Sequence, residues 1–85
     1  MTRAIATDLA PHGILVNTLS PGFILTELTE RTMGKEGIEE VCQQIPAGRL
    51  AKPEEVAEVA AFLLSSNNTY LTGQNIIVDG GFTNV

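Results

Sequence analysis

The sequence is short of the residues on which many metal and redox sites depend. Cys42 is the only cysteine among its 85 residues, which excludes an internal disulfide and a cluster of thiolate metal ligands. Cys42 continues the apolar spacing of Ile38 and Val41, a position where a free cysteine usually packs as a small hydrophobic residue. We therefore expect neither a structural disulfide nor a metal site.

Positive charge is scarce as well. The chain carries five Lys and Arg against ten Asp and Glu, a formal net charge of −5 at pH 7. Eight of the ten acidic residues lie within residues 27–58, where glutamates typically form a solvated outer face. Because nucleic acids and anionic membrane surfaces repel such a chain, we expect neither as a partner.

Long apolar runs are absent too. No stretch approaches the ~20 apolar residues that a membrane-spanning helix requires. Arg3 and Asp8 interrupt the first apolar residues, where a signal peptide would need a continuous apolar core. The length suffices for one small domain, and a hydrophobic content of 44% is ordinary for a globular protein. These features predict a cytoplasmic protein.

The most informative stretch that is present covers residues 14–26. Residues 14–20 form a near-continuous apolar run rich in branched side chains, which is typical of a strand in a parallel sheet covered on both faces. The run stops at Pro21 and Gly22 and gives way to a loop closed by Thr26. Since open parallel sheets bind ligands beyond the carboxyl ends of their strands, this loop is the candidate ligand site.

The other predicted elements surround this strand. They are a helix over residues 1–10, short helices over 27–33 and 38–45, a helix over 53–64 and a second buried strand over 75–79. The 53–64 helix is apolar on most sides, which predicts that it is buried on most sides. The order helix, strand, helical crossover, strand implies parallel strands. Two strands bury too little, so we expect a partner or a larger parent protein to complete the sheet.

Four segments together resemble the C-terminal third of a short-chain dehydrogenase/reductase (SDR), a family of NAD(P)-dependent oxidoreductases. They are residues 9–17, residues 20–26 with the pattern Pro-Gly-x-x-x-Thr, residues 49–57 and residues 72–81. The members most similar in kind are 3-oxoacyl-carrier-protein reductases and gluconate or sugar dehydrogenases. The resemblance implies an α/β fold in which residues 1–85 form the C-terminal part of one Rossmann-type domain with a doubly wound parallel sheet.

The resemblance also implies a role for the Pro-Gly loop. Pro21 and Gly22 would turn the backbone beneath the nicotinamide of NAD or NADP. The main chain around Ile24 would bond the carboxamide, and Thr26 would bond the carboxamide or the phosphates. By its position alone, Thr26 is also a candidate N-cap for the helix that follows it, and the two roles are compatible. Residues 25–50 would form the lid that selects a small carbonyl or alcohol substrate.

The catalytic machinery of the family has no counterpart in the sequence. Both its glycine-rich turn, which cradles the pyrophosphate, and its catalytic Tyr-x-x-x-Lys pair are missing. Tyr70 is the only tyrosine, and four residues later stands Gln74, which does not lower the pKa of a phenol as a lysine would. Ser20 precedes the loop without a paired base. We therefore predict no catalytic residue and no turnover by these residues alone.

Three interpretations remain open at this stage. In the first, the chain is the C-terminal part of an oxidoreductase that moves a hydride between nicotinamide and a carbonyl or alcohol carbon. In the second, it is a non-catalytic association module, and residues 56–64 and the last strand form homo-oligomer contacts as they typically do in the family. The third, an independent small α/β ligand binder, is the least favoured because two strands bury too little.

Overall fold

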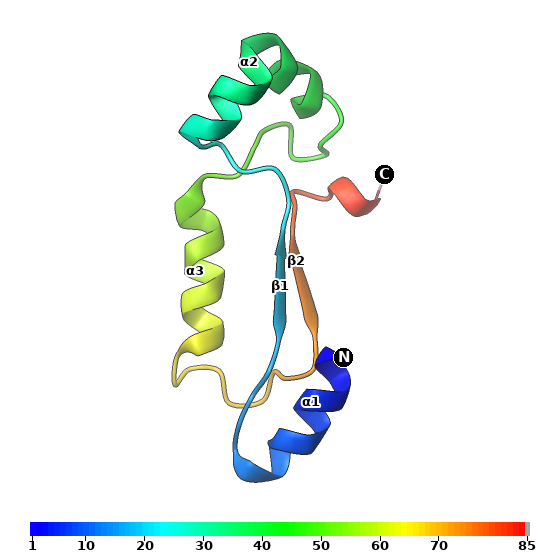
Figure 1. Ribbon diagram of the computed structural model, residues 1–85, viewed down its shortest axis with the longest axis vertical. Helices are drawn as coiled ribbons and strands as arrows, with labels where there is room; N and C mark the ends of the chain where they lie inside the picture. Colours follow the sequence, from blue (N-terminus) through cyan, green and yellow to red (C-terminus); the bar gives the residue numbers. More distant parts are fainter. Residues whose placement is uncertain (85) are drawn as a thin grey trace.

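A two-stranded parallel sheet runs along the middle of the molecule in the computed structural model, which describes residues 1–84 (Figure 1). Strand β1 (Thr18–Pro21) pairs with strand β2 (Asn75–Val78) in parallel. The register places Thr18 opposite Asn75 and Pro21 opposite Val78. This pairing confirms the predicted parallel arrangement of two strands that lie more than 50 residues apart in the sequence.

Strand β1 is shorter and begins later than predicted. Pairing was expected from residue 14, but it starts at Thr18 because β2 begins only at Asn75. The preceding extended residues bond instead to the segment that leads into β2. The Val16 amide donates to Thr72 Oγ1 at 2.9 Å, and the Gly73 amide donates to the Val16 carbonyl at 2.7 Å. The apolar run therefore continues the direction of β1 without belonging to the sheet.

Asn17, the one strongly polar residue of the apolar run, bonds this run to the segment that leads into β2. Its Nδ2 donates to the Leu71 carbonyl at 2.9 Å, and its Oδ1 accepts from the Gln74 amide at 3.1 Å. Both ends of the side-chain amide are thus bonded to the segment before β2. The structural role expected for a polar residue in an apolar run is confirmed.

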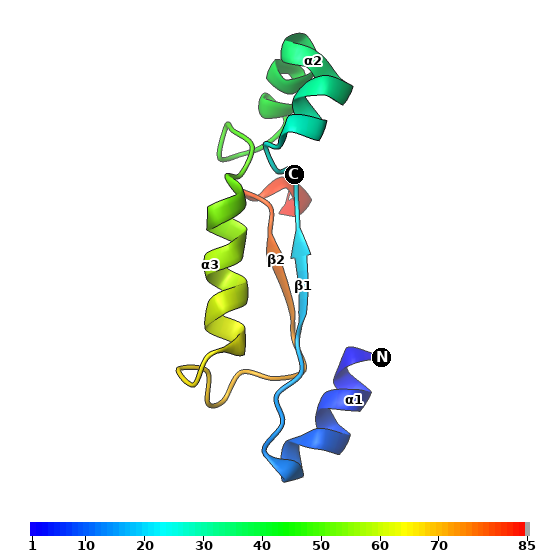
Figure 2. The same ribbon diagram turned by 60° about the vertical axis from the view of Figure 1, so that its left-hand side comes forward.

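Helix α1 (Thr2–Leu9) and the short 3-10 helix η1 (Ala10–His12) precede the sheet and lie near the beginning of its strands (Figures 1 and 2). Gly13 ends this helical region with a φ of 75°, a left-handed conformation that glycine adopts without strain. The predicted helix over residues 1–10 is confirmed, and a short 3-10 helix extends it to His12. Ala6, on the small-residue face of α1, is buried and lies against Gly73.

Helix α2 (Glu27–Cys42) lies beyond the carboxyl ends of both strands (Figures 1 and 2). Gly34 interrupts it with non-helical angles, φ 69° and ψ 171°, so two helical parts meet at a kink. The sequence predicted two short helices separated near this glycine, and the break is confirmed. The second part ends at Cys42 rather than at residue 45, because Ile45 turns inward and is buried.

Helix α3 (Pro53–Leu64) runs alongside the two strands, but it is not buried on most sides as predicted (Figures 1 and 2). None of its residues is buried, and Leu64 is 89% exposed. The apolar strands are incompletely covered as well, as expected for only two strands without a partner, because Ile77 of β2 is 49% exposed. Two strands and one flanking helix offer too little surface to cover these apolar faces.

The overall shape reflects this incomplete packing. The molecule measures 49 × 24 × 19 Å and has a radius of gyration of 15.7 Å, whereas a compact domain of this length would have about 12 Å. Within residues 1–84 the buried hydrophobic side chains are those of Ala6, Ile45 and Leu50. No helix of this part of the chain is both long and apolar enough to cross a membrane.

The chain ends in a tight turn beyond β2. The backbone reverses at Asp79–Gly81 and enters the short 3-10 helix η2 (Phe82–Asn84). The sequence predicted a sharp end to the strand at this position, and the structure confirms it. Residue 85, the last of the predicted tail, lies outside the described residues.

Candidate functional site

The loop of residues 21–26 follows directly from the carboxyl end of β1. The Gly22 amide donates to the Val78 carbonyl at 2.9 Å, so the loop begins as an extension of the sheet ladder. Pro21 is the last residue of β1, so the strand and the loop share this residue. The loop therefore leaves the sheet at the edge where parallel sheets bind their ligands.

A glycine is required at position 22 because Asp79, in the turn after β2, lies directly against it. A Cβ atom at Gly22 would lie 2.7 Å from Asp79 Cβ and 2.9 Å from Asp79 Cα, distances that real Cβ atoms essentially never show. The family resemblance implied that Gly22 turns the backbone beneath the nicotinamide. The structure supplies a further reason for a glycine, because the turn after β2 occupies the space that a side chain would need.

The middle of the loop is bonded to the segment that returns from α2. The Leu25 amide donates to the Ala51 carbonyl at 2.9 Å, and the Ala51 amide donates to the Phe23 carbonyl at 2.9 Å. These two bonds form an isolated parallel bridge between Ile24 and Ala51. Main-chain bonds therefore bring together the two ends of the predicted lid, residues 25–50.

Thr26 ends the loop and caps α2. Its Oγ1 accepts from the Thr29 amide at 3.1 Å and lies 2.9 Å from Thr29 Oγ1. Thr29 Oγ1 in turn donates to the Ile24 carbonyl at 2.8 Å. The predicted N-cap role of Thr26 is confirmed, and a residue that the sequence analysis missed, Thr29, joins two of the predicted site residues.

An open cleft of about 420 Å³ lies between the loop and the first turns of α2. Its lining contains three of the four predicted cofactor-binding residues and residues from one face of α2: Gly22, Phe23, Ile24, Thr26, Leu28, Thr29, Thr32 and Met33. Pro21 is not part of this lining. The cleft is mostly apolar with a few hydroxyl and main-chain groups, a composition typical of small-molecule sites.

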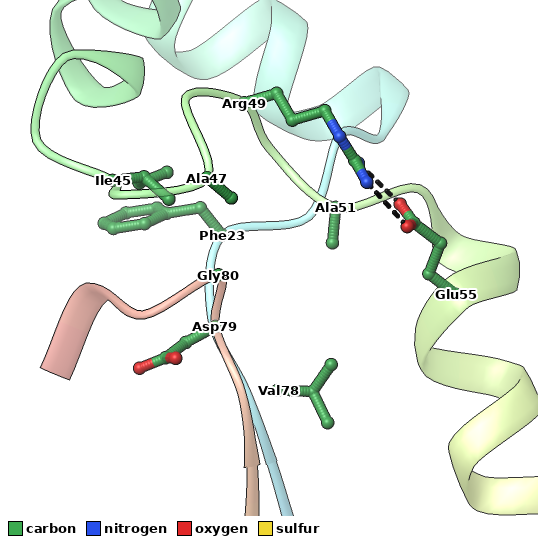
Figure 3. A pocket seen from close by; sticks show the side chains of 9 residues that line it. All are labelled: Phe23, Ile45, Ala47, Arg49, Ala51, Glu55, Val78, Asp79 and Gly80. Carbon is green, nitrogen blue, oxygen red and sulfur yellow. Dashed lines mark hydrogen bonds and ion pairs between the residues drawn. The ribbon is translucent and has the colours of Figure 1, made fainter. Parts of the chain in front are cut away.

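A second, smaller cavity of about 220 Å³ lies on the other side of Phe23 (Figure 3). Figure 3 shows the Phe23 ring beside Ile45 and Ala47, with Val78 at the opposite wall. Phe23 also meets Phe82 edge to face, with ring centroids 5.3 Å apart and an interplanar angle of 86°. The sequence analysis assigned no role to either phenylalanine, since no local pattern links positions 59 residues apart.

Arg49 and Glu55 close one end of this cavity with a bidentate ion pair (Figure 3). Arg49 Nη1 and Nη2 donate to the two carboxylate oxygens at 2.7 and 2.8 Å, and the Lys52 amide donates to Glu55 Oε1 at 2.8 Å. The hydrogen bond from Arg49, followed by that from the Lys52 amide, lowers the pKa of Glu55 to about 2. The pair fixes the corner between the lid and α3.

Asp79 organises the turn at the other end of the cavity. Its carboxylate oxygens accept from the Gly81 amide at 3.0 Å and the Thr83 amide at 2.9 Å. The hydrogen bond from the Thr83 amide is the main cause that lowers the pKa of the Asp79 carboxyl. Asp79 is thus an ionised turn residue that fixes the backbone beside Gly22.

The residues excluded from a catalytic role lie elsewhere. Tyr70 is 96% exposed in the segment between α3 and β2. Ser20 lies within β1 and donates to Asn75 Oδ1 at 2.7 Å. Among the described residues the lining of the cleft at the loop contains no acidic or basic side chain.

Comparison with known proteins places this arrangement in a family. Residues 1–83 match the pattern of the family described as enoyl-(acyl carrier protein) reductase. Over 83 residues the chain is 46% identical to the NAD-dependent glycerol dehydrogenase of Listeria innocua, covering 98% of this chain and 33% of that protein. It is 47% identical over 81 residues to a 3-oxoacyl-acyl-carrier-protein reductase of Thermotoga maritima, covering 95% of this chain and 32% of the relative.

A solved structure shows the same backbone. The structure of ElxO with NADP bound superposes with a TM-score of 0.88 at 27% identity, covering 99% of this chain and 35% of that one. The chain therefore spans about a third of the length of the proteins it matches. NAD and NADP, the two cofactors expected from the sequence, are those that these proteins name. With the parallel sheet and the loop beyond its carboxyl end, these matches show that the chain belongs to the short-chain dehydrogenase/reductase family.

Proposed function

We propose that the chain is the C-terminal part of an NAD(P)-dependent oxidoreductase that transfers a hydride between nicotinamide and a carbonyl or alcohol carbon. In this role residues 21–26 form one side of the nicotinamide pocket. Residues 25–50 form the substrate lid. The rest of the protein would bind the pyrophosphate and supply the proton donor. The 3-oxoacyl and glycerol enzymes among its relatives act on substrates of this chemical class.

The observation that carries the proposal is the cleft at the carboxyl ends of β1 and β2. Its volume of about 420 Å³ is within the range of small-molecule sites. Gly22, Ile24 and Thr26 line it together, as their assignment to one ligand requires. The cleft is open, and the remainder of the protein would have to complete the nicotinamide pocket.

The residues present fit one face of a nicotinamide ring and its carboxamide. The apolar side chains of Phe23, Leu28 and Met33 supply a surface for the ring, and Ile24 and Thr26 supply polar groups for the carboxamide. When bound, the cofactor supplies the hydride. This chain's residues position the ring and exclude water from it, and they hold no group that moves a proton.

Placement in the C-terminal third rests on the motifs that are present and absent. Residues 21–26 and the turn after β2 resemble family segments that follow its catalytic Tyr-x-x-x-Lys pair. The tyrosine of this chain, Tyr70, stands far from the cleft and is followed by Gln74 rather than lysine at the required spacing. The proton donor would therefore come from the part of the enzyme that precedes these residues.

A second candidate function, subunit association, is favoured by the exposed apolar face of α3. Phe62 is 45% exposed and Leu64 is 89% exposed, and an apolar cavity of about 320 Å³ lies between α3 and residues 15–19. Two large exposed side chains beside an apolar cavity are typical of a surface that a partner covers. We propose that α3 and β2 form homo-oligomer contacts in the complete enzyme, a role compatible with the first.

Fragment complementation tests the first function. The Thermotoga reductase is 47% identical to the 85-residue chain over 81 residues. The chain would be co-expressed with the N-terminal two thirds of that reductase. We expect NAD(P)H oxidation with a 3-oxoacyl substrate in the complex and none with either part alone. Turnover by the isolated 85 residues would refute the proposal, and a stable complex without cofactor binding would favour the association role by itself.

A further inference from the structure

Three hydrogen bonds join Thr29 to two of the residues that line the cleft. Its amide donates to Thr26 Oγ1 at 3.1 Å, its hydroxyl donates to the Ile24 carbonyl at 2.8 Å, and its Oγ1 lies 2.9 Å from Thr26 Oγ1. Thr29 is half-buried, whereas Thr26 is exposed. Thr29 therefore lies behind the residues that would touch a ligand.

The direction of these bonds follows from counting protons. A hydroxyl has one proton to donate and two lone pairs that accept. A carbonyl oxygen accepts only, so the single hydroxyl proton of Thr29 is used on Ile24. The proton between the two hydroxyls must then come from Thr26. A directed chain runs from Thr26 through Thr29 to the Ile24 carbonyl.

This direction decides what Thr26 offers to a ligand. Its proton points inward to Thr29, and one of its lone pairs accepts from the Thr29 amide. One lone pair remains, so Thr26 faces the cleft as a hydrogen-bond acceptor. An acceptor suits the amine of a carboxamide and does not suit a phosphate, which carries only acceptor oxygens when ionised.

We propose that Thr29 is a positioning residue that holds Thr26 as an acceptor for the carboxamide amine of the nicotinamide cofactor. The inference rests on the proposed function and narrows it, because it selects the carboxamide over the phosphates as the partner of Thr26. Thr29 acts through Thr26 and Ile24 and does not touch the cofactor.

The test compares isosteric changes at two helical threonines whose hydroxyls both donate to a main-chain carbonyl. Thr29→Val keeps the shape and the amide donor but removes the hydroxyl, which frees the Thr26 proton to rotate outward. Thr29→Ser restores the hydroxyl. Thr7→Val is the matched control, because the exposed Thr7 lies in α1, outside the lining of the cleft, and its hydroxyl donates to the Arg3 carbonyl at 2.8 Å.

Cofactor affinity is measured by fluorescence titration of NADH and NADPH against the complementation complex. We expect Thr29→Val to raise Kd about fivefold, as loss of one neutral hydrogen bond would. Thr29→Ser and Thr7→Val should leave Kd within about twofold of the unchanged complex. Equal effects of Thr29→Val and Thr7→Val would overturn the proposal.

A cofactor analogue separates the carboxamide from other partners. Acetylpyridine adenine dinucleotide carries a methyl ketone in place of the carboxamide and so lacks the amine. Its Kd should be the same for the unchanged complex and for Thr29→Val. A similar loss of affinity for the analogue and for NAD would overturn the assignment to the amine, since Thr26 would then be contacting another group.

A readout on the 85-residue chain separates this inference from the proposed function. In a ¹⁵N–¹H spectrum of the chain, Thr29→Val should shift the Ile24, Leu25 and Thr26 amides, and Thr7→Val should not. Absence of these shifts would overturn the proposed bonds from Thr26 to Thr29 and from Thr29 to Ile24, whether or not the complex binds the cofactor. Absence of any cofactor binding by the unchanged complex would overturn the proposed function, and with it the carboxamide as the partner of Thr26.

Discussion

Two regions of the molecule, the carboxyl end of the sheet and helix α3, differ in how completely this chain packs them. At the carboxyl end of the sheet, main-chain bonds join residues 21–26, the segment returning from α2 and the turn after β2, and Ile45 and Leu50 are buried there. Along α3 no residue is buried, and Leu64 is 89% exposed. The loop that would face a ligand is therefore built within this chain, whereas the helix that would face a partner is not covered by it.

This difference indicates which of the two proposed roles, binding and association, depends on this chain alone. Main-chain hydrogen bonds need only short segments to approach each other, so the loop acquires its shape from two strands and a returning segment. Burial of an apolar helix needs a broad surface opposite it, which two strands do not provide. The proposed binding role thus depends on local order, and the proposed association role depends on a second molecule or segment.

The same substitution in both regions gives the largest expected contrast. Leu50→Ala removes a side chain that is only 5% exposed, and we expect it to destabilise the chain by about 2–5 kcal/mol. Leu64→Ala changes an exposed side chain and should alter stability by about 0.5 kcal/mol or less. Thermal unfolding followed by circular dichroism measures both, and similar losses for the two variants would contradict the comparison.

The close contact of Gly22 with Asp79 predicts the next largest effect. Gly22→Ala would place a methyl group 2.7 Å from Asp79 Cβ, and we expect a loss of about 1–3 kcal/mol from the forced backbone shift. Gly37→Ala in α2 is the control. There the nearest atom is Met33 Cβ at 3.3 Å, and the helix preference of alanine offsets the tight contact. A neutral Gly22→Ala would show that the loop and the turn are free to separate.

The pair of aromatic rings predicts a smaller effect confined to the loop. Phe82→Ala removes the edge-to-face contact with Phe23, which is worth about 0.5–1.5 kcal/mol beyond the loss of buried area. The amides of residues 21–26 should shift and broaden in a ¹⁵N–¹H spectrum. Phe62→Ala on α3 makes the same chemical change at the other region and should leave these amides unmoved.

The Arg49–Glu55 pair predicts the smallest effect, and one that depends on pH. Because the folded-state pKa of Glu55 is lowered to about 2, its contribution to stability is present above the unfolded-state pKa of about 4.3. It is lost as the pH falls from there towards 2. The effect should be modest and salt-sensitive, since the Arg49 and Glu55 side chains are 56% and 40% exposed.

Glu55→Gln provides the comparison for this prediction. The melting temperature of the unchanged chain should exceed that of the variant at pH 6 and converge with it near pH 2. A constant difference across this range would mean that the carboxylate charge contributes nothing. A difference that grows on acidification would contradict the sign of the pKa shift.

The sequence by itself determined the local elements and the position of the loop. Helix starts and stops depend on nearby residues, so the helices predicted over residues 1–10 and 53–64 and the break predicted after residue 33 lie close to where the structure has them. The family motif placed Gly22, Ile24 and Thr26 in one site, and the structure brings them to one cleft. Parallel pairing followed from the order of the elements, since a helical crossover returns the chain in the same direction.

Only the tertiary structure decided which residues complete the site and which faces stay open. The start of β1 at Thr18 depends on where its partner strand β2 begins, which the residues of β1 do not determine. Thr29, Phe82 and Asp79 support the loop through contacts that depend on how the chain returns. Apolar patterning predicts that α3 must be buried, but the surface that buries it must lie close in space, and the described part of this chain does not supply that surface.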